Sequence, residues 1–172
     1  MKKTVSAIIG VFMISAVAGF ASFTPPTTAQ IAAAANNPAG VAALLQGASS
    51  EQAAQVIKSV IVQALALGLD TQAANTRVAN IVTAGFSANP TGSAPLLAAN
   101  LGTACGLTLA ISGHSSVVSA IQNAIISANG TKGNALAAAF GSAFVEAEQG
   151  AANNGGNKGN VPPITTGYEG QR

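Results

Sequence analysis

The chain has 172 residues, of which 49% are hydrophobic, 7% are charged and 4% are aromatic. Its formal net charge of +2 is too small to favour nucleic acid or an anionic membrane surface as a partner. The scarcity of aromatic rings also argues against a sugar-binding platform or a surface that stacks single-stranded bases. The apolar content is nevertheless enough to form a core, so we expect a folded protein.

Residues 1–29 have the pattern of a secretory signal peptide. Lys2-Lys3 precedes an apolar run of roughly 16 residues, Val5–Phe20, which is short for a membrane-spanning helix of ~20 residues. Among the small-x-small sites that follow, Thr27-Thr28-Ala29 is preferred, because Pro25-Pro26 should hold the chain extended there. The alternative is that the segment stays attached as an anchor helix. From the signal-peptide pattern we predict export to the periplasm, the cell surface or the extracellular space.

Cleavage would remove two of the seven basic residues and leave five basic against five acidic ones, a neutral protein. Such a protein lacks the net charge that keeps small domains apart, so self-association is favoured. The single cysteine, Cys105, cannot form a disulfide within the chain. Because it lies in an apolar run, we expect a buried thiol rather than a bridge between chains.

Residues 30–150 predict one all-α domain of about five helices, which are expected to start near residues 50, 71, 93, 115 and 133. Ser49 and Gln52 have the spacing of a capping box at the first start, and Asp70 can cap the second helix. The third helix is expected to close at Ser112-Gly113, and the fifth to end near Gly150.

The spacing of these starts suggests a degenerate unit of about 21 residues, one helix plus one turn. The alternative is that five ordinary helices have similar lengths. The fold is therefore expected to be an Ala-rich helical bundle or a short α-solenoid, with short loops that favour antiparallel neighbours.

The 54 residues from Val78 to Thr131 contain no Asp, Glu, Lys or Arg. At the usual level of ~25% charged residues, so long a run is very improbable by chance. Three explanations remain open: these helices form the interior, they face a partner or a second copy, or they enter a membrane. One apolar face is a candidate for packing or assembly, and it consists of Leu97, Leu101, Ala104, Val118, Ile121 and Ile125.

Membrane insertion of residues 94–128 is the runner-up. Gly102-x-x-x-Gly106 is a small-x-x-x-small motif of the kind that joins membrane helices, but it also serves close packing in a soluble bundle. The surrounding apolar run is short and contains Asn100.

Residues 151–172 predict a flexible tail rich in Gly, Asn and Pro. Its apolar residues Val161, Ile164 and Tyr168 are compatible either with a disordered tail or with a short peptide that docks against another subunit.

No motif for catalysis, a metal, a cofactor, a phosphate or another small molecule stands out in the sequence. Cys105 and the only histidine, His114, are separated by a helix end and should lie roughly a dozen Å apart. We therefore expect a non-enzymatic structural or interaction protein of the bacterial envelope or extracellular matrix. Its partner is expected to be a second copy or another envelope protein. A membrane-active helical protein and a small secreted enzyme are the alternatives.

Overall fold

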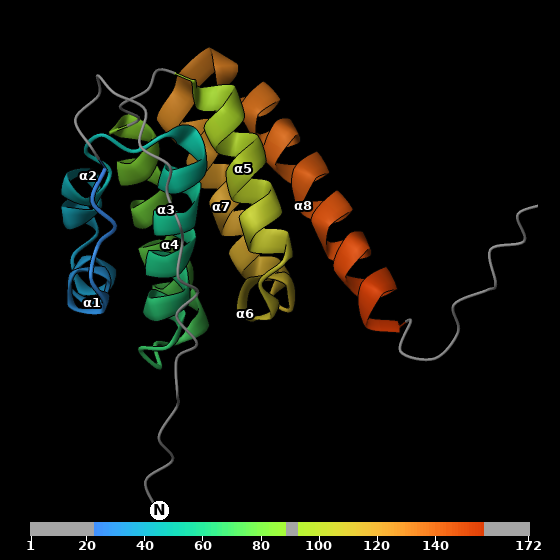
Figure 1. Cartoon of the computed structure of the whole chain (residues 1–172), viewed down its shortest axis with the longest axis horizontal. Helices are drawn as coiled ribbons and strands as arrows, with labels where there is room; N and C mark the ends of the chain where they lie inside the picture. Colours follow the sequence, from blue (N-terminus) through green and yellow to red (C-terminus); the bar gives the residue numbers. More distant parts are fainter. Residues whose placement is uncertain (1–22, 89–92, 157–172) are drawn as a thin grey trace, which may run out of the picture.

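The computed structural model describes residues 23–88 and 93–156, and within these ranges every regular element is a helix (Figure 1). The prediction of an all-α fold is confirmed. Residues 1–22, 89–92 and 157–172, which include most of the predicted signal and the apolar tail residues Val161, Ile164 and Tyr168, lie outside the described part. The elements are α1 (Thr28–Asn36), η1 (Pro38–Gly40), α2 (Val41–Leu44), α3 (Ser50–Leu65), α4 (Thr71–Ser87), α5 (Ala94–Gly106), α6 (Leu109–Ser112), α7 (Ser115–Asn129), η2 (Gly130–Lys132) and α8 (Gly133–Gly156).

Local side-chain hydrogen bonds set the starts of α3 and α4, as predicted. The Ser49 hydroxyl accepts a hydrogen bond from the backbone N–H of Gln52 at 3.2 Å, and Gln52 Oε1 accepts one from the N–H of Ser49 at 2.9 Å. Asp70 Oδ1 accepts from the N–H of Ala73 at 2.8 Å. These bonds satisfy N–H groups that a helix start otherwise leaves without partners.

Two predicted helix ends are wrong. The third helix does not run to Ser112: α5 ends at Gly106, Thr108 adopts an extended backbone, and α6 is a separate short turn. Glycine followed two positions later by a β-branched residue is a weak continuation of a helix. Conversely, α8 continues past Gly150 to Gly156 into the expected tail. The good helix formers Gln149, Ala151 and Ala152 offset the cost of Gly150, ~1 kcal/mol, whereas helix propensity does not explain the last four residues of α8.

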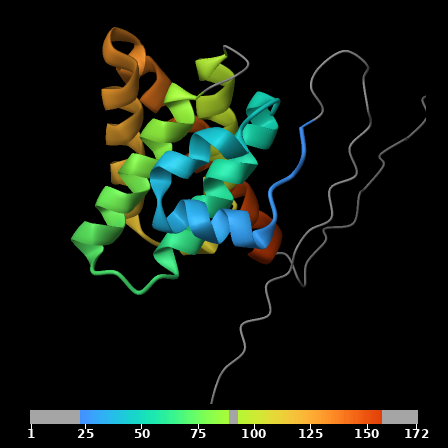
Figure 2. The same cartoon turned by 90° about the vertical axis from the view of Figure 1, so that its left-hand side faces the viewer.

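The five longer helices form a closed ring. In order around this ring, α3 contacts α4, α4 contacts α7, α7 contacts α8, α8 contacts α5, and α5 returns to α3. The short elements α1, η1 and α2 cover α3 and α4 from outside (Figure 2). Since most of these contacts join helices that are not consecutive in the chain, the arrangement is that of a bundle, and the 21-residue repeat is not confirmed.

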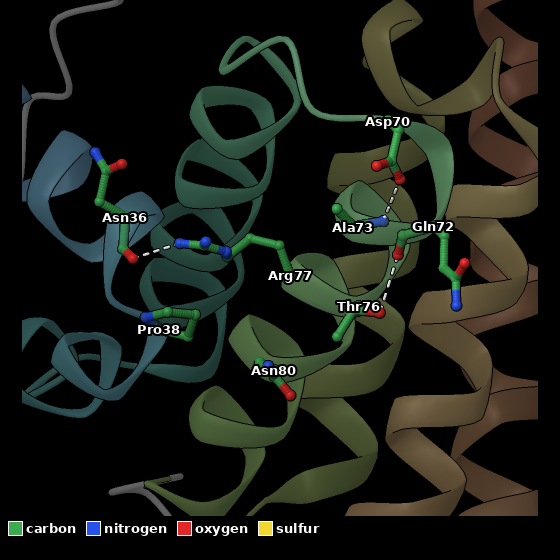
Figure 3. Close-up of a pocket in the computed structure, with 8 residues that line it drawn as sticks. All are labelled: Asn36, Pro38, Asp70, Gln72, Ala73, Thr76, Arg77 and Asn80. Carbon is green, nitrogen blue, oxygen red and sulfur yellow. Dashed lines mark hydrogen bonds between the residues drawn. The ribbon is translucent and has the colours of Figure 1, made fainter.

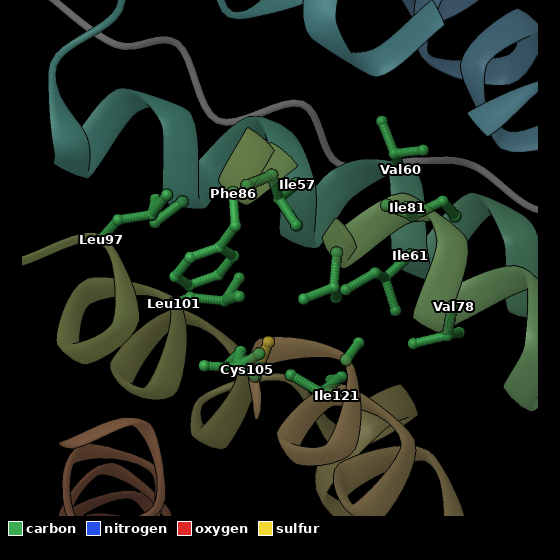
Figure 4. Packing of buried hydrophobic residues seen from close by; sticks show 14 of the residues in the cluster. Ile57, Val60, Ile61, Val78, Ile81, Phe86, Leu97, Leu101, Cys105 and Ile121 are labelled. Carbon is green, nitrogen blue, oxygen red and sulfur yellow. The ribbon is translucent and has the colours of Figure 1, made fainter. Parts of the chain in front are cut away.

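The core fills the space inside the ring with branched aliphatic side chains. Ile57 and Ile61 of α3, Ile81 of α4, Leu101 of α5 and Ile121 of α7 are fully buried and converge there (Figure 4). Fully burying such a side chain contributes ~1.5–3 kcal/mol, so this cluster dominates the stability of the fold.

The helices α5 and α8 pack tightly along their length, and this contact uses the small-x-x-x-small motif. An ideal Cβ built on Gly102 would lie 2.2 Å from the carbonyl oxygen of Phe140, and one on Gly106 would lie 2.4 Å from that of Phe144. Residue numbers rise in the same direction along both helices at this contact, so α5 and α8 run parallel. The glycines therefore join two helices of the same bundle.

Candidate interaction surface

The predicted packing or assembly face lies inside the bundle. Leu97, Leu101, Ile121 and Ile125 have no exposed surface, Ala104 is buried, and Val118 is partly buried against the core. Of the two roles left open for these six residues, the structure supports packing within the chain. Five of them are not available on the surface of the folded bundle, and Val118 is only partly accessible.

A different set of uncharged residues is exposed on α5 and α6. Leu96 is 59% exposed, Leu107 is 61% exposed and Leu109 is 83% exposed. Thr103 is also exposed and lies between Leu96 and Leu107 on α5 at helical spacing. We call the patch formed by Leu96, Thr103, Leu107 and Leu109 the α5–α6 surface. In Figure 1, α5 lies between α3 and α8, with α6 at its C-terminal end.

The outer face of α7 differs from this patch although it belongs to the same charge-free segment. Its exposed residues are polar and include Ser115, Ser119 and Asn123. Uncharged polar groups interact well with water, whereas exposed leucines do not. The charge-free segment is thus divided into a core, a hydrophilic α7 face and an apolar α5–α6 surface.

The α5–α6 surface was not predicted from the sequence, although part of the signal was present. Leu96 and Leu97 are adjacent, so a helix must turn one of them away from the core when the other faces it. Leu107 and Leu109 could not be recognised because the third helix was expected to continue through them.

A polar hollow lies where α1 meets α4 (Figure 3). Arg77 donates hydrogen bonds from Nη1 to the carbonyl oxygen of Ala35, at 3.1 Å, and to that of Asn36. These carbonyls end α1 and have no partners within that helix, and a cation is favoured at this negative end of the helix dipole. Arg77 therefore attaches the end of α1 to α4.

Cys105 and His114 do not form a reactive pair. Cys105 is buried in the core, while His114 is exposed at the start of α7. Burial raises the pKa of the Cys105 thiol to about 12, and the positive charge of Lys58 acts in the opposite direction. The thiol is consequently protonated at neutral pH and is a poor nucleophile. Within the described ranges, no group of three or more His, Cys, Asp or Glu side chains could hold a metal ion.

We expect the Cys105 thiol to resist labelling by a maleimide in the native protein and to react at the rate of a free cysteine in urea. Its burial also makes stability depend on pH. In the unfolded chain the thiol has its ordinary pKa of 9.0, whereas in the folded chain its pKa is about 12. Stability is therefore complete below pH 9 and declines toward pH 12, by about 2 kcal/mol at pH 10.5.

Urea unfolding at pH 8 and pH 10.5 measures this decline, and Cys105→Ala provides the control. The variant should lose most of the difference between the two pH values, whatever its stability at pH 8. Rapid labelling of native Cys105 at neutral pH would contradict the buried position.

Comparisons of the chain with protein-family models, with curated proteins and with solved structures find no significant match. None of the helices in the described ranges combines the length and hydropathy needed to cross a membrane.

Proposed function

We propose that this is an exported, non-enzymatic protein of the bacterial envelope or extracellular matrix that binds a second copy of itself through the α5–α6 surface. The exposure of Leu96, Leu107 and Leu109 on an otherwise charge-free patch carries the proposal. Leu107 and Leu109 flank the break between α5 and α6, and Leu96 lies on the same side of α5 about three turns earlier. Exposed apolar side chains that gather on one side of a small domain mark a contact with another molecule.

The chemistry of the patch favours a second copy as the partner. A two-fold contact brings the same surface of both molecules together, so any charge on it would meet a like charge. Here the charge-free segment 78–131 supplies all four residues of the patch, so none of them carries a charge that would have to lose its hydration. Another envelope protein with an apolar patch would satisfy the same requirement.

The expected affinity follows from the size of the patch. Three leucines from each copy, already partly buried, can each contribute about 1–2 kcal/mol on full burial. Association costs ~4–15 kcal/mol in lost translational and rotational freedom. Because the gain from these leucines and the cost of association are of similar size, we expect a weak contact that depends on protein concentration.

Replacing Leu107 and Leu109 together with lysine should weaken self-association at least tenfold, because two charges would have to be desolvated at the contact. Both side chains are largely exposed, so the fold should be retained. Sedimentation of the mature protein over a range of concentrations measures the effect. The double variant Ser119→Lys/Asn123→Lys adds the same charge on the exposed face of α7 and should associate as the unmodified protein does.

A monomer at every concentration would refute self-association. Equal loss of association in both double variants would show that net charge, and not the α5–α6 surface, controls it. Flotation of the unmodified protein with lipid vesicles, abolished by the leucine substitutions alone, would favour membrane association as the use of this surface.

A further inference from the structure

We propose that the signal peptide is removed upstream of Phe23, so that residues 23–29 belong to the mature domain. This inference rests on the proposed export of the chain. It replaces the preferred cleavage site after Ala29 with one of the earlier small-x-small sites, which end at Ala18 and Ala21.

The first support is the capping box at α1. The Thr27 hydroxyl accepts a hydrogen bond from the backbone N–H of Gln30 at 3.3 Å, and Gln30 Oε1 accepts one from the N–H of Thr27 at 2.8 Å. Cleavage after Ala29 would remove Thr27 and both bonds. It would also place a new α-amino charge at the N-terminal end of α1, where the helix dipole disfavours positive charge.

The second support is the packing of Phe23. This side chain is partly buried and contacts the hydrophobic core, although it lies six positions before Ala29 in a segment without helix. A residue of the discarded signal would have no reason to complete the core of the mature domain. The chain 23–27 thus leads from the core to the cap of α1.

The third support is the conformation of the chain around Ala29. Thr28 and Ala29 lie in the first turn of α1, not in the extended segment that was expected there. The segment that is free of helix, residues 23–27, ends at Thr27. A cut upstream of Phe23 leaves all of these folded elements intact.

The test is the N-terminal sequence and intact mass of the protein recovered outside the cytoplasm of producing cells. An N-terminus at Gly19 or Ser22 is expected. An N-terminus at Gln30 would overturn the inference and leave the proposed export standing. A chain recovered outside the cytoplasm that keeps Met1 would overturn the inference alone, whereas a chain found only in the cytoplasm would overturn both.

Thermal unfolding of exported variants gives an independent readout of whether Thr27 is part of the mature fold. Thr27→Ala should lower Tm by about 2–8 °C, because it removes a helix cap. Thr28→Ala, one position later at an exposed site, should change Tm little. Equal Tm values for the two variants would overturn the inference.

Discussion

Replacing Ile121 with lysine is expected to destabilise the fold by at least about 4 kcal/mol. Ile121 lies on α7 and is fully buried in the core (Figure 4). The helices α4 and α8 pack against α7. The substitution loses ~1.5–3 kcal/mol of apolar burial and places an unpaired ammonium group in the core. This loss is a large part of the ~5–15 kcal/mol by which a folded domain is stable, so the urea midpoint should fall steeply.

Circular dichroism during urea unfolding measures this effect, and Ser119→Lys on the same helix is the matched control. Ser119 is exposed, so the same charge there should change stability by no more than ~0.5 kcal/mol. A cooperative unfolding transition of Ile121→Lys close to that of Ser119→Lys would mean that α7 does not face the core as described.

Replacing Gly102 with alanine is expected to destabilise the fold by about 2–3 kcal/mol, although alanine is the better helix former. The new Cβ would lie 2.2 Å from the carbonyl oxygen of Phe140 and 3.1 Å from the Cβ of Ala143. Because the first of these atoms belongs to the backbone of α8, the clash can be relieved only by moving the two helices apart.

Gly150→Ala is the control for this substitution, with the opposite expected sign. Gly150 lies in α8, and an added Cβ there meets no atom within 4 Å. Helix propensity then acts alone and should stabilise the helix by up to ~1 kcal/mol. The stabilities of both variants are measured by urea unfolding. If Gly102→Ala were stabilising as well, the close approach of α5 and α8 would be contradicted.

The starts of the helices could be predicted because they depend on local interactions. Ser49 with Gln52, and Asp70 with Ala73, form their bonds within one helical turn, so the necessary information lies in four consecutive residues. The buried side of each helix could likewise be recognised from periodicity, as Ile57 and Ile61 illustrate.

The arrangement of the helices could not be predicted in the same way. Gly102 and Gly106 have a spacing that fits close packing, but the sequence around them does not indicate that α8 is the helix they contact. Regular spacing of helix starts suggested stacked units, whereas the contacts of α5 with α3 and α8 close a ring. Helix lengths are set by local breaks, and they leave the pairing of distant helices undetermined.

The sequence could not locate the α5–α6 surface either, because its exposure depends on how the helices are arranged. A charge-free segment is compatible with a core, a contact surface or a membrane, and the structure divides it between Leu101 inside the bundle and Leu96, Leu107 and Leu109 outside. The exposure of the last two follows from the end of α5 at Gly106, a boundary that composition alone did not reveal.

We propose that a second copy covers the α5–α6 surface, while the outer face of α7 stays open to water. Maleimide labelling of Thr103→Cys, a position in the middle of the α5–α6 surface, tests this contact directly. The native Cys105 is buried and should not react with the maleimide. We predict that labelling of this cysteine slows as the protein concentration rises, while labelling of Ser119→Cys does not. A rate at Thr103→Cys that is independent of concentration, and equal to that at Ser119→Cys, would contradict the account.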